Sequence, residues 1–174
     1  MTKQDISVNE REIMAYYGYK GSIGRFQLRC KFIRSWLLHK LAYSSINSNF
    51  IIKMQRMRGA KIGEDCHFSP YVLLDLVYPS LINIEKNVTI GSNSMIFAHA
   101  NPTASPFLKK IYPRKVNQVT IKSGAVIFPG CIITAGVTIG ENSMIGAGSV
   151  VFEDVPDYCV VLGNPARVVK KIDH

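Results

Sequence analysis

The chain has 174 residues, of which 47% are hydrophobic, and a formal net charge of +9. Its length suits a single domain with a sizeable core. No run approaches the roughly 18 apolar residues that span a bilayer, and the polar start MTKQDISVNERE lacks the apolar stretch of a signal peptide. We therefore expect a soluble, cytoplasmic protein.

The excess of positive charge lies in the first third of the chain. Residues 1–61 hold 12 Lys and Arg against 3 Asp and Glu, whereas residues 62–174 hold 9 against 9. We expect residues 1–58 to form a basic helical segment. Such a segment is suited to contact with an acidic partner or an anionic surface, and it equally suits a solvated face.

Two helices are expected in this segment, at 25–43 and 46–58, because apolar residues recur there at helical spacing. The first stripe consists of Phe26, Cys30, Ile33, Leu37 and Leu41. In the second helix Phe50, Met54 and Met57 share one side, and beyond them lie Lys53, Arg56 and Arg58. We expect these apolar faces to cover the start of the fold that follows. The alternative is a basic amphipathic surface that rests on anionic lipid, and Trp36 suits both.

A six-residue repeat runs through residues 59–155. Large apolar residues open its hexads, namely Ile62, Phe68, Leu74, Ile84, Ile90, Ile96, Ile121, Ile127, Ile133, Ile139, Ile145 and Val151. The residue four positions on is small in each uninterrupted hexad. Glycine often follows the apolar residue (Gly63, Gly91, Gly140 and Gly146), where we expect corners with unusual backbone angles. Three hexads per turn predict a three-sided parallel β-helix of about four coils.

Two insertions interrupt the repeat. The first adds four residues, within DLVYPSLI, to the hexad that Leu74 opens. The second is longer: Ile96 and Ile121 are 25 residues apart, which is not a multiple of six, so we expect a loop at about 100–116. Long loops in compact folds are often functional. His99 stands at the root of this loop, away from the inward position of its hexad. Asp75 precedes it by a little more than one coil and is therefore expected near it.

The stretches VTIGENSMIGAGSVV and VPDYCVVLGNPARVVKKI resemble the hexapeptide-repeat acyltransferases, in particular the maltose and galactoside O-acetyltransferase group. The resemblance covers about residues 58–172. It implies an all-β, left-handed parallel β-helix with an N-terminal helical cap and a C-terminal cap at 156–174. It also implies acetyl-CoA as the acyl donor and a homotrimer, in which the donor lies between two subunits.

The resemblance assigns roles to individual residues. His99 takes the place of the general base, whose ordinary pKa near 6.5 suits proton transfer at neutral pH. Asp75 and Asn101 take substrate-orienting places, although Asp75 equally suits capping of a corner. Ala100 stands where related sequences often have an acidic residue, and Phe152 and Glu153 stand where Thr and Lys are frequent. Residues at donor-binding places are Pro129, Ala135, Gly136, Ala147, Phe152, Glu153, Arg167 and Lys170.

We expect an O-acetyltransferase that acts on a sugar hydroxyl in cell-surface polysaccharide biosynthesis. Enzymatic alternatives are an N-acetyltransferase acting on an amino sugar or nucleotide sugar and a xenobiotic acetyltransferase. A non-enzymatic β-helix that serves as a scaffold or binding module is a further alternative. The four histidines and four cysteines lack metal-site spacing, so we expect no metal. No nucleic-acid motif accompanies the basic charge.

Overall fold

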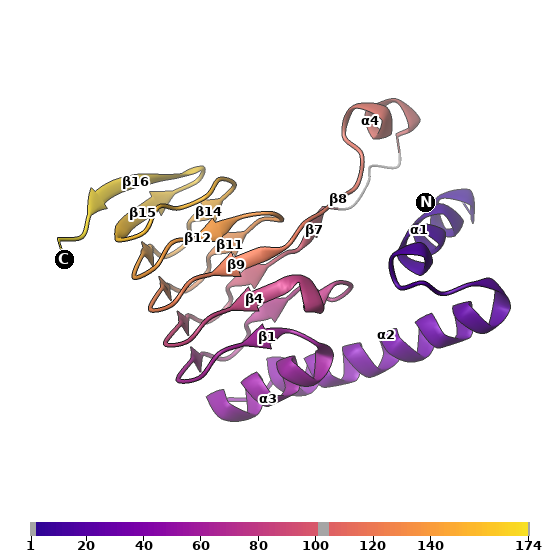
Figure 1. The fold of residues 1–174 in the computed structure, drawn as a ribbon, viewed down its shortest axis with the longest axis horizontal. Coiled ribbons are helices and arrows are strands. Elements are labelled where there is room, and N and C mark those ends of the chain that lie inside the picture. The colour runs from indigo at the N-terminus through magenta and orange to yellow at the C-terminus, as the bar shows by residue number, and fades with distance from the viewer. Residues whose placement is uncertain (1–2, 101–104, 174) are drawn as a thin grey trace.

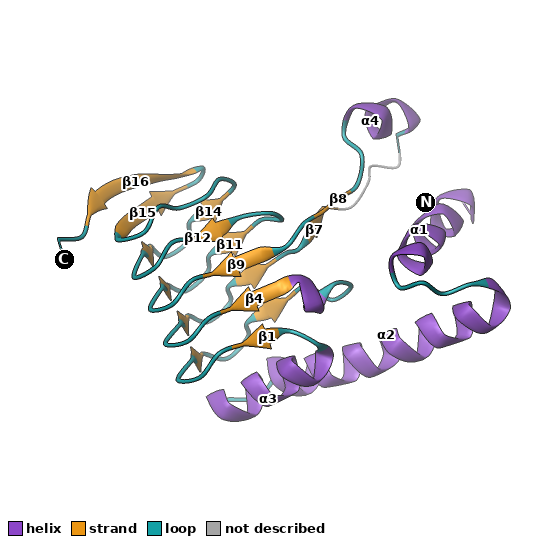
Figure 2. Ribbon diagram, in the orientation of Figure 1, coloured by secondary structure: helices purple, strands orange, loops and turns teal. Residues whose placement is uncertain are grey.

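The computed structural model describes residues 3–100 and 105–173 of the chain. Three helices precede a stack of short strands, and a two-stranded ribbon ends the chain (Figure 1, Figure 2). The helices are α1 (Lys3–Tyr16), α2 (Gly21–Tyr43) and α3 (Ser48–Arg58). As Figure 1 shows, α3 and α2 lie at the end of the stack where β1 begins, and the C-terminus lies at the other end.

The strands form three parallel sheets, which the chain visits in rotation. One sheet has the order β1 (Lys61–Ile62), β4 (Ile82–Ile84), β9 (Val119–Ile121), β12 (Thr138–Ile139). The second contains β2 (His67–Phe68), β5 (Thr89–Ile90), β10 (Val126–Ile127), β13 (Met144–Ile145) and β15 (Cys159–Gly163), to which β16 (Ala166–Lys171) is added antiparallel. The third contains β3 (Leu73–Leu74), β6 (Met95–Ile96), β11 (Ile132–Ile133) and β14 (Val150–Val151). Three parallel sheets visited in this order make a three-sided β-helix.

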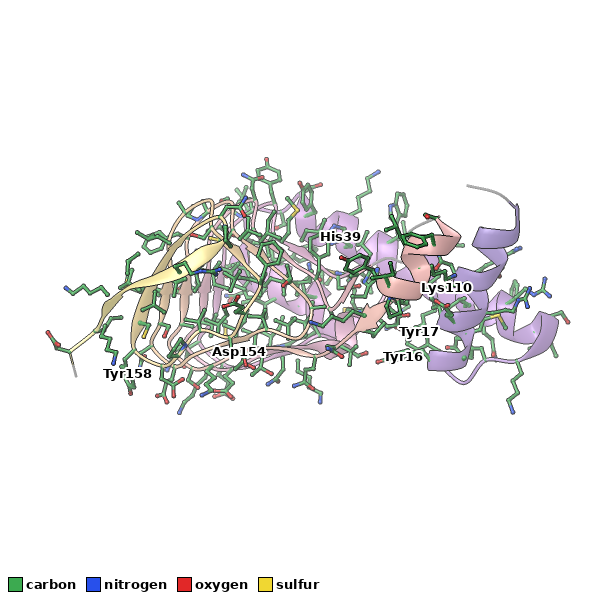
Figure 3. The ribbon with its side chains drawn as sticks, turned by 90° about the horizontal axis from the view of Figure 1, so that it is seen from above. Tyr16, Tyr17, His39, Lys110, Asp154 and Tyr158 are labelled. Atoms are coloured by element: carbon green, nitrogen blue, oxygen red, sulfur yellow. The ribbon has the colours of Figure 1, made fainter. Side chains whose placement is uncertain are left out.

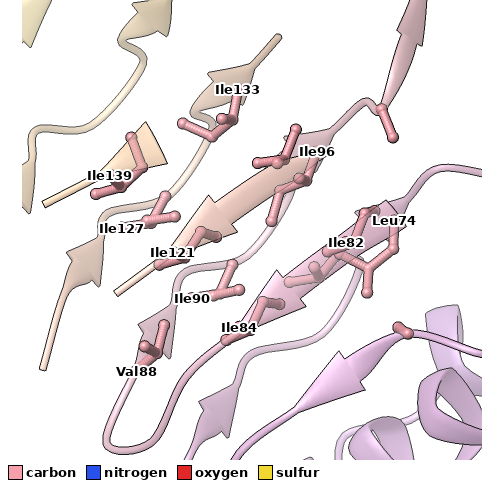
Figure 4. Packing of buried hydrophobic residues seen from close by; sticks show 14 of the residues in the cluster. Leu74, Ile82, Ile84, Val88, Ile90, Ile96, Ile121, Ile127, Ile133 and Ile139 are labelled. Atoms are coloured by element: carbon pink, nitrogen blue, oxygen red, sulfur yellow. The ribbon is translucent and has the colours of Figure 1, made fainter. Parts of the chain in front are cut away.

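The first residues of the hexads fill the interior of this prism, as the repeat predicts. In the first sheet, for example, Ile121 pairs in register with Ile84 and Ile139, and all three side chains are buried. The stacked isoleucines are visible in Figure 4. Parallel pairing keeps like residues above one another, so every added coil extends one continuous apolar column. Ile62, in the first coil, is half-buried.

The corners differ from expectation in which residue adopts the unusual backbone angle. Gly63, Gly91, Gly140 and Gly146 are not in the left-handed region. That conformation instead occurs two residues later, at Asp65, Tyr71, Asn87, Asn93, Gly124, Gly130, Gly136, Asn142 and Gly148. Gly63, Gly91 and Gly140 are instead required by space, because a Cβ there would meet backbone atoms. A Cβ on Gly140 would lie 2.3 Å from the carbonyl carbon of Pro156, and one on Gly91 would lie 2.5 Å from the nitrogen of Pro129.

The helices pack differently from expectation. In α3 the side chain of Asn47 accepts a hydrogen bond from the Phe50 amide at the start, and Gly59 ends the helix in the left-handed conformation. The expected apolar face of α3 was partly wrong, because Phe50 and Met57 are 40% and 46% exposed whereas Arg58 is buried. Helix α1 lies within the expected helical segment but was not among its two expected helices, and it buries Ile13 and Met14.

The expected buried stripe of α2 is exposed. Its inner face is formed by small residues and one leucine, namely Gly24, Leu28, Ser35 and Ala42. The residues expected to be covered are exposed: Phe26, Cys30, Ile33, Leu37 and Leu41. The reason is that α2 packs on α3 rather than directly on the strands, and small residues allow the two helices to approach closely. Within the described residues, no helix is long and apolar enough to cross a membrane.

Both insertions leave the prism at the same corner, on successive coils, because Leu74 is stacked on Ile96. The first contains the short 3-10 helix η1 (Pro79–Leu81). The second begins at β7 (His99–Ala100), which pairs antiparallel with β8 (Lys115–Val116), and it carries α4 (Pro106–Ile111) between them. Ala100 therefore lies exposed on an arm rather than at a crowded corner. The chain departs at His99 itself.

We predict that Gly140→Ala destabilises the protein by roughly 1–3 kcal/mol, because the new methyl group would press on the Pro156 backbone of the next coil. Gly146→Ala is the matched control, since it occupies the same hexad position. Its Cβ would meet the end of the Leu162 side chain, which is 46% exposed and can rotate away. Urea unfolding should show a clearly larger loss for Gly140→Ala; equal losses would contradict the steric explanation.

Candidate active site

The carboxylate of Asp75 connects the two insertions. Its Oδ1 accepts hydrogen bonds from the amides of Val77 and Tyr78, both at 2.8 Å. Its Oδ2 accepts one from the Ala98 amide at 2.8 Å and lies 2.5 Å from Nδ1 of His99. The register of β3 and β6 brings these residues together, because Leu74 stands beside Ile96. One buried carboxylate thus binds the backbone at the start of both insertions and also the imidazole of His99.

The surroundings of Asp75 keep it ionised. Its side chain is fully buried, which alone would raise its pKa, but the hydrogen bonds from His99, Tyr78 and Val77 outweigh burial and lower the pKa below the ordinary value. An ionised carboxylate can only accept hydrogen bonds, so Nδ1 of His99 must carry the proton. Nε2 of a neutral imidazole is then the basic nitrogen, and the His99 side chain keeps 10% of its surface exposed.

Arg58 of α3 supports the same corner from below. Its guanidinium donates to the backbone oxygen of Asp75 at 2.7 Å and of Leu74 at 3.3 Å, and to the side chains of Gln55 and Ser35. Burial lowers the pKa of Arg58 to about 10, while the charge of Asp75 acts in the opposite direction. The helical segment therefore contributes a buried cation to the site.

Tyr78 and Arg114 form one wall beside His99. The Tyr78 ring meets the imidazole edge-on, with ring centroids 5.3 Å apart. The Tyr78 hydroxyl accepts a hydrogen bond from Arg114 at 3.1 Å, and burial raises its pKa although Arg114 opposes the shift. Arg114 also donates to Asn9 of α1 at 2.7 Å. This contact joins the second insertion to the N-terminal helix.

Tyr16, the last residue of α1, and Tyr17 directly after it complete that wall. The Tyr16 ring meets Tyr78 at 4.7 Å, and the Tyr17 hydroxyl donates to the backbone oxygen of Val77. Figure 3 shows Tyr16 and Tyr17 at the same end of the molecule as Lys110 of α4, with Asp154 and Tyr158 at the opposite end. The first helix thus lies beside the site on the face where the second insertion emerges.

The structure brings together only some of the residues expected at the site. His99 and Asp75 are in contact, as the coil spacing predicts. Asp75 has no exposed surface, and both of its oxygens are occupied, so it positions His99 and cannot itself contact an acceptor. Asn101 lies outside the described residues. His67 is exposed on β2, and His39 lies on α2 beside Arg58, where burial and then the Arg58 charge lower its pKa to about 4.

The residues expected to bind the acyl donor lie on two corners of the prism. Strand register places Ala135 and Gly136 over the His99 corner, and Phe152 and Glu153 one coil further on. Pro129 and Ala147 lie on the neighbouring corner, where the Gly148 amide donates to the Pro129 carbonyl at 3.0 Å. Ala147, Gly148 and Gly136 are exposed, and a Cβ on Gly148 would meet no atom within 4 Å. Both corners therefore offer bare backbone to an extended ligand.

The expected cations of the tail lie on β16, where Arg167 and Lys170 are both exposed. Arg167 lies 3.8 Å from the carboxylate of Glu153, which is an exposed ion pair. Such a pair contributes little to stability, so Arg167 is available to an anionic ligand that displaces Glu153.

Three further residues of the site were missed from the sequence, namely Arg58, Tyr78 and Arg114. Tyr78 is part of the DLVYPSLI insertion, so its distance of three residues from Asp75 was a usable signal. Arg114 belongs to the second insertion, which starts at His99, so its place in the chain was also a usable signal. Arg58 carried no such signal, because it reaches the site through the packing of α3. Within the described residues, no three His, Cys, Asp or Glu side chains are grouped to hold a metal ion.

Comparisons with known proteins agree with this architecture. Residues 118–153 match the bacterial transferase hexapeptide family (six repeats). The chain is 36% identical over 115 residues to the galactoside O-acetyltransferase of Lactococcus lactis, covering 64% of this chain and 55% of that protein. It thus spans less than two thirds of the length of this relative and of the Escherichia coli galactoside O-acetyltransferase.

Two solved structures are also similar. The maltose O-acetyltransferase of Clostridium difficile 630 has a TM-score of 0.67 and 25% identity, over 85% of this chain and 89% of that one. A galactoside acetyltransferase in complex with coenzyme A has a TM-score of 0.63 and 28% identity, over 84% and 82% of the two chains. The expected relationship to the hexapeptide-repeat acetyltransferases is therefore confirmed.

We predict that Asp75→Asn lowers the free energy of unfolding at pH 7 by about 1–3 kcal/mol, because one amide donor of the corner would lose its acceptor. The folded pKa of Asp75 is lowered, so its stabilisation is fully present above the ordinary value of 3.8 and is lost as the pH falls through the lower folded value. The difference between variant and wild type should therefore shrink below about pH 4.

Asp65→Asn is the control for this experiment. Asp65 is exposed and already in the left-handed conformation that Asn tolerates. Urea unfolding at pH 7 should change by no more than about 0.5 kcal/mol in this variant. A loss in Asp75→Asn that persists unchanged into acid would show that the carboxylate charge does not hold the corner.

Proposed function

We propose that the chain is an acetyl-CoA-dependent O-acetyltransferase that modifies a sugar hydroxyl in cell-surface polysaccharide biosynthesis in the cytoplasm. The observation that carries the proposal is the contact between buried, ionised Asp75 and Nδ1 of His99 at the root of the second insertion. The names of the similar proteins, galactoside and maltose O-acetyltransferases, support the reaction and the class of acceptor. The coenzyme A complex of a similar structure supports the donor.

In the proposed mechanism His99 is the general base. Asp75 holds the first ring proton on Nδ1, which leaves Nε2 free to act as the base. Nε2 accepts the proton of the sugar hydroxyl while the hydroxyl oxygen attacks the carbonyl carbon of the acetyl thioester. The carbon–sulfur bond then breaks, and the coenzyme A thiolate takes the proton from the imidazolium. Asp75 stabilises the imidazolium that forms between these steps, because its negative charge is buried beside Nδ1. A base of this kind typically contributes about 10²–10⁴-fold in rate.

The donor groove forms the second part of the proposal. Ala135, Gly136, Phe152 and Glu153 share the His99 corner, whereas Pro129 and Ala147 lie on the neighbouring one. As the resemblance to the hexapeptide-repeat acyltransferases implies, the ligand lies between two copies of the chain, with the second corner supplied by the other copy. We therefore propose a homotrimer, with Arg167 and Lys170 placed to meet the phosphates of coenzyme A.

We also propose that the β-helix is left-handed and has about four coils. The chain is then divided into a helical segment at 1–58, the β-helix at 59–155 and a C-terminal cap at 156–174. The rotation of the strands through three parallel sheets and the similarity to the maltose O-acetyltransferase structure support these features.

We predict that His99→Ala reduces acetyl transfer to a galactoside or maltose acceptor by at least about 100-fold, because the attacking hydroxyl loses its base. Release of the coenzyme A thiol measures the reaction, and calorimetric titration measures acetyl-CoA binding, which should stay near the wild-type value. His67→Ala is the matched control, because His67 is exposed on β2 and should keep full activity. Full turnover in His99→Ala would refute the assignment.

The same assay separates the alternatives. If an amino sugar is acetylated at least about tenfold faster than any hydroxyl acceptor, the activity is N-acetylation rather than the proposed O-acetylation. Acetyl-CoA that fails to raise the melting temperature at saturating concentration would favour a non-enzymatic binding protein, because a ligand of the native state must stabilise it.

The trimer is tested by mass. We predict that analytical ultracentrifugation of the wild type gives three times the 19.4 kDa mass of one chain. The groove requires two copies, so a fully active monomer would contradict the proposed groove even if His99 proved essential.

A further inference from the structure

The outer face of α2 exposes five large apolar side chains. Its residues, called the outer stripe below, are Ile23, Phe26, Ile33, Leu37 and Leu41, which are 74%, 67%, 59%, 49% and 53% exposed. At about 100° per residue they fall on one side of the helix, opposite the inner face at Leu28 and Ser35. Within the 23-residue helix this stripe runs from Ile23 to Leu41, over about 27 Å. Contiguous apolar surface of this kind marks a contact site.

The charge around the outer stripe has one sign. Between Glu12 and Glu64 the sequence has ten Lys and Arg residues and no Asp or Glu. On α2 the exposed cations Arg25, Arg29 and Lys40 lie on one side of the stripe, and Arg34 borders its other edge. Among the ion pairs of the described residues, none includes a cation of α2. The flanking positive charge is therefore uncompensated within this part of the chain.

This charge distribution discriminates between occupants of the stripe. A second copy of α2 would bring a row of cations against another row of cations, which opposes pairing. An anionic lipid surface accepts the apolar side chains below its headgroups and attracts the cations on both edges. Trp36 suits the headgroup region: it is 54% exposed on the side of α2 that carries Arg29 and Lys40, and Nζ of Lys40 lies 5.4 Å from its ring centroid.

We propose that α2 docks lengthwise on an anionic membrane surface, with the outer stripe inserted among the lipids and its cations at the headgroups. The inner face stays on the protein, where Ser35 accepts a hydrogen bond from Arg58 and Ala42 is buried. Docking therefore requires no rearrangement of the helices. The inference stands on α2 alone and does not depend on the proposed reaction.

Sedimentation with vesicles tests the proposal in the full chain. Wild-type protein should bind vesicles of phosphatidylcholine with one third phosphatidylserine at least about tenfold more strongly than pure phosphatidylcholine, because each cation near an anionic surface contributes to binding. The variant Arg25→Glu, Arg29→Glu, Lys40→Glu should lose at least about tenfold in binding. Arg34 is left unchanged because it donates to the Met57 carbonyl.

The matched control reverses three exposed cations elsewhere, in Lys61→Glu, Lys86→Glu, Lys171→Glu. It has the same net charge as the α2 variant and should bind within about threefold of the wild type. An equal loss of vesicle binding in both variants would show that only the net charge of the protein matters, and it would overturn the proposal. Binding by the wild type that does not depend on phosphatidylserine would overturn it as well.

A second variant tests insertion rather than charge. Phe26→Ser, Ile33→Ser, Leu37→Ser removes the exposed apolar groups while keeping every cation, and it should also lose at least about tenfold in vesicle binding. Circular dichroism confirms that the helices remain. A variant that keeps vesicle binding, or that sediments as a smaller assembly than the wild type, would show that the stripe does not insert into lipid and would contradict the proposal.

Discussion

The structure around the site depends on the hydrogen bonds of one buried carboxylate. Asp75 receives the amides of Val77 and Tyr78, where the first insertion begins, and the amide of Ala98, where the second begins. Leaving such amides unpaired in the interior costs about 1–3 kcal/mol each, so the carboxylate is a structural requirement before it is a chemical one. The same ionised group then fixes the proton on the ring of His99. Corner geometry and imidazole chemistry share one cause.

The β-helix explains why that corner is rigid. Stacked isoleucines and parallel backbone pairing hold each coil in register with the next, so Asp75 and His99 are placed by strands on both sides. The N-terminal helices reinforce the corner, since Arg58 binds the Asp75 backbone and Asn9 binds Arg114. The segment that carries the outer stripe is thereby connected through buried contacts to the residues beside His99.

The repeat made most of the β-helix predictable, whereas contacts between its parts were not. The six-residue pattern of large and small residues specifies which positions point inward and which lie at corners. Its interruptions predicted where the insertions are, and its spacing predicted that Asp75 lies near His99. The pattern could not distinguish a glycine required for an unusual backbone angle from one required for lack of space. At Gly140 the reason is space, because a Cβ would meet the backbone of Pro156. The prediction that Phe26 is buried was wrong, because helical spacing defines an apolar stripe but does not indicate which face of the helix packs on the protein. Arg58 was taken as a surface cation because its burial depends on how α3 packs.

The most direct test of the central claim is the protonation pattern of the His99 ring. Nitrogen-15 NMR of the wild type, compared with His99→Ala for assignment, distinguishes the two neutral tautomers. The proton should reside on Nδ1, with Nε2 bare and basic, because the ionised Asp75 beside Nδ1 can only accept. A ring found with its proton on Nε2 at neutral pH would mean that Asp75 does not hold the imidazole as the structure indicates, and the proposed base would be lost with it.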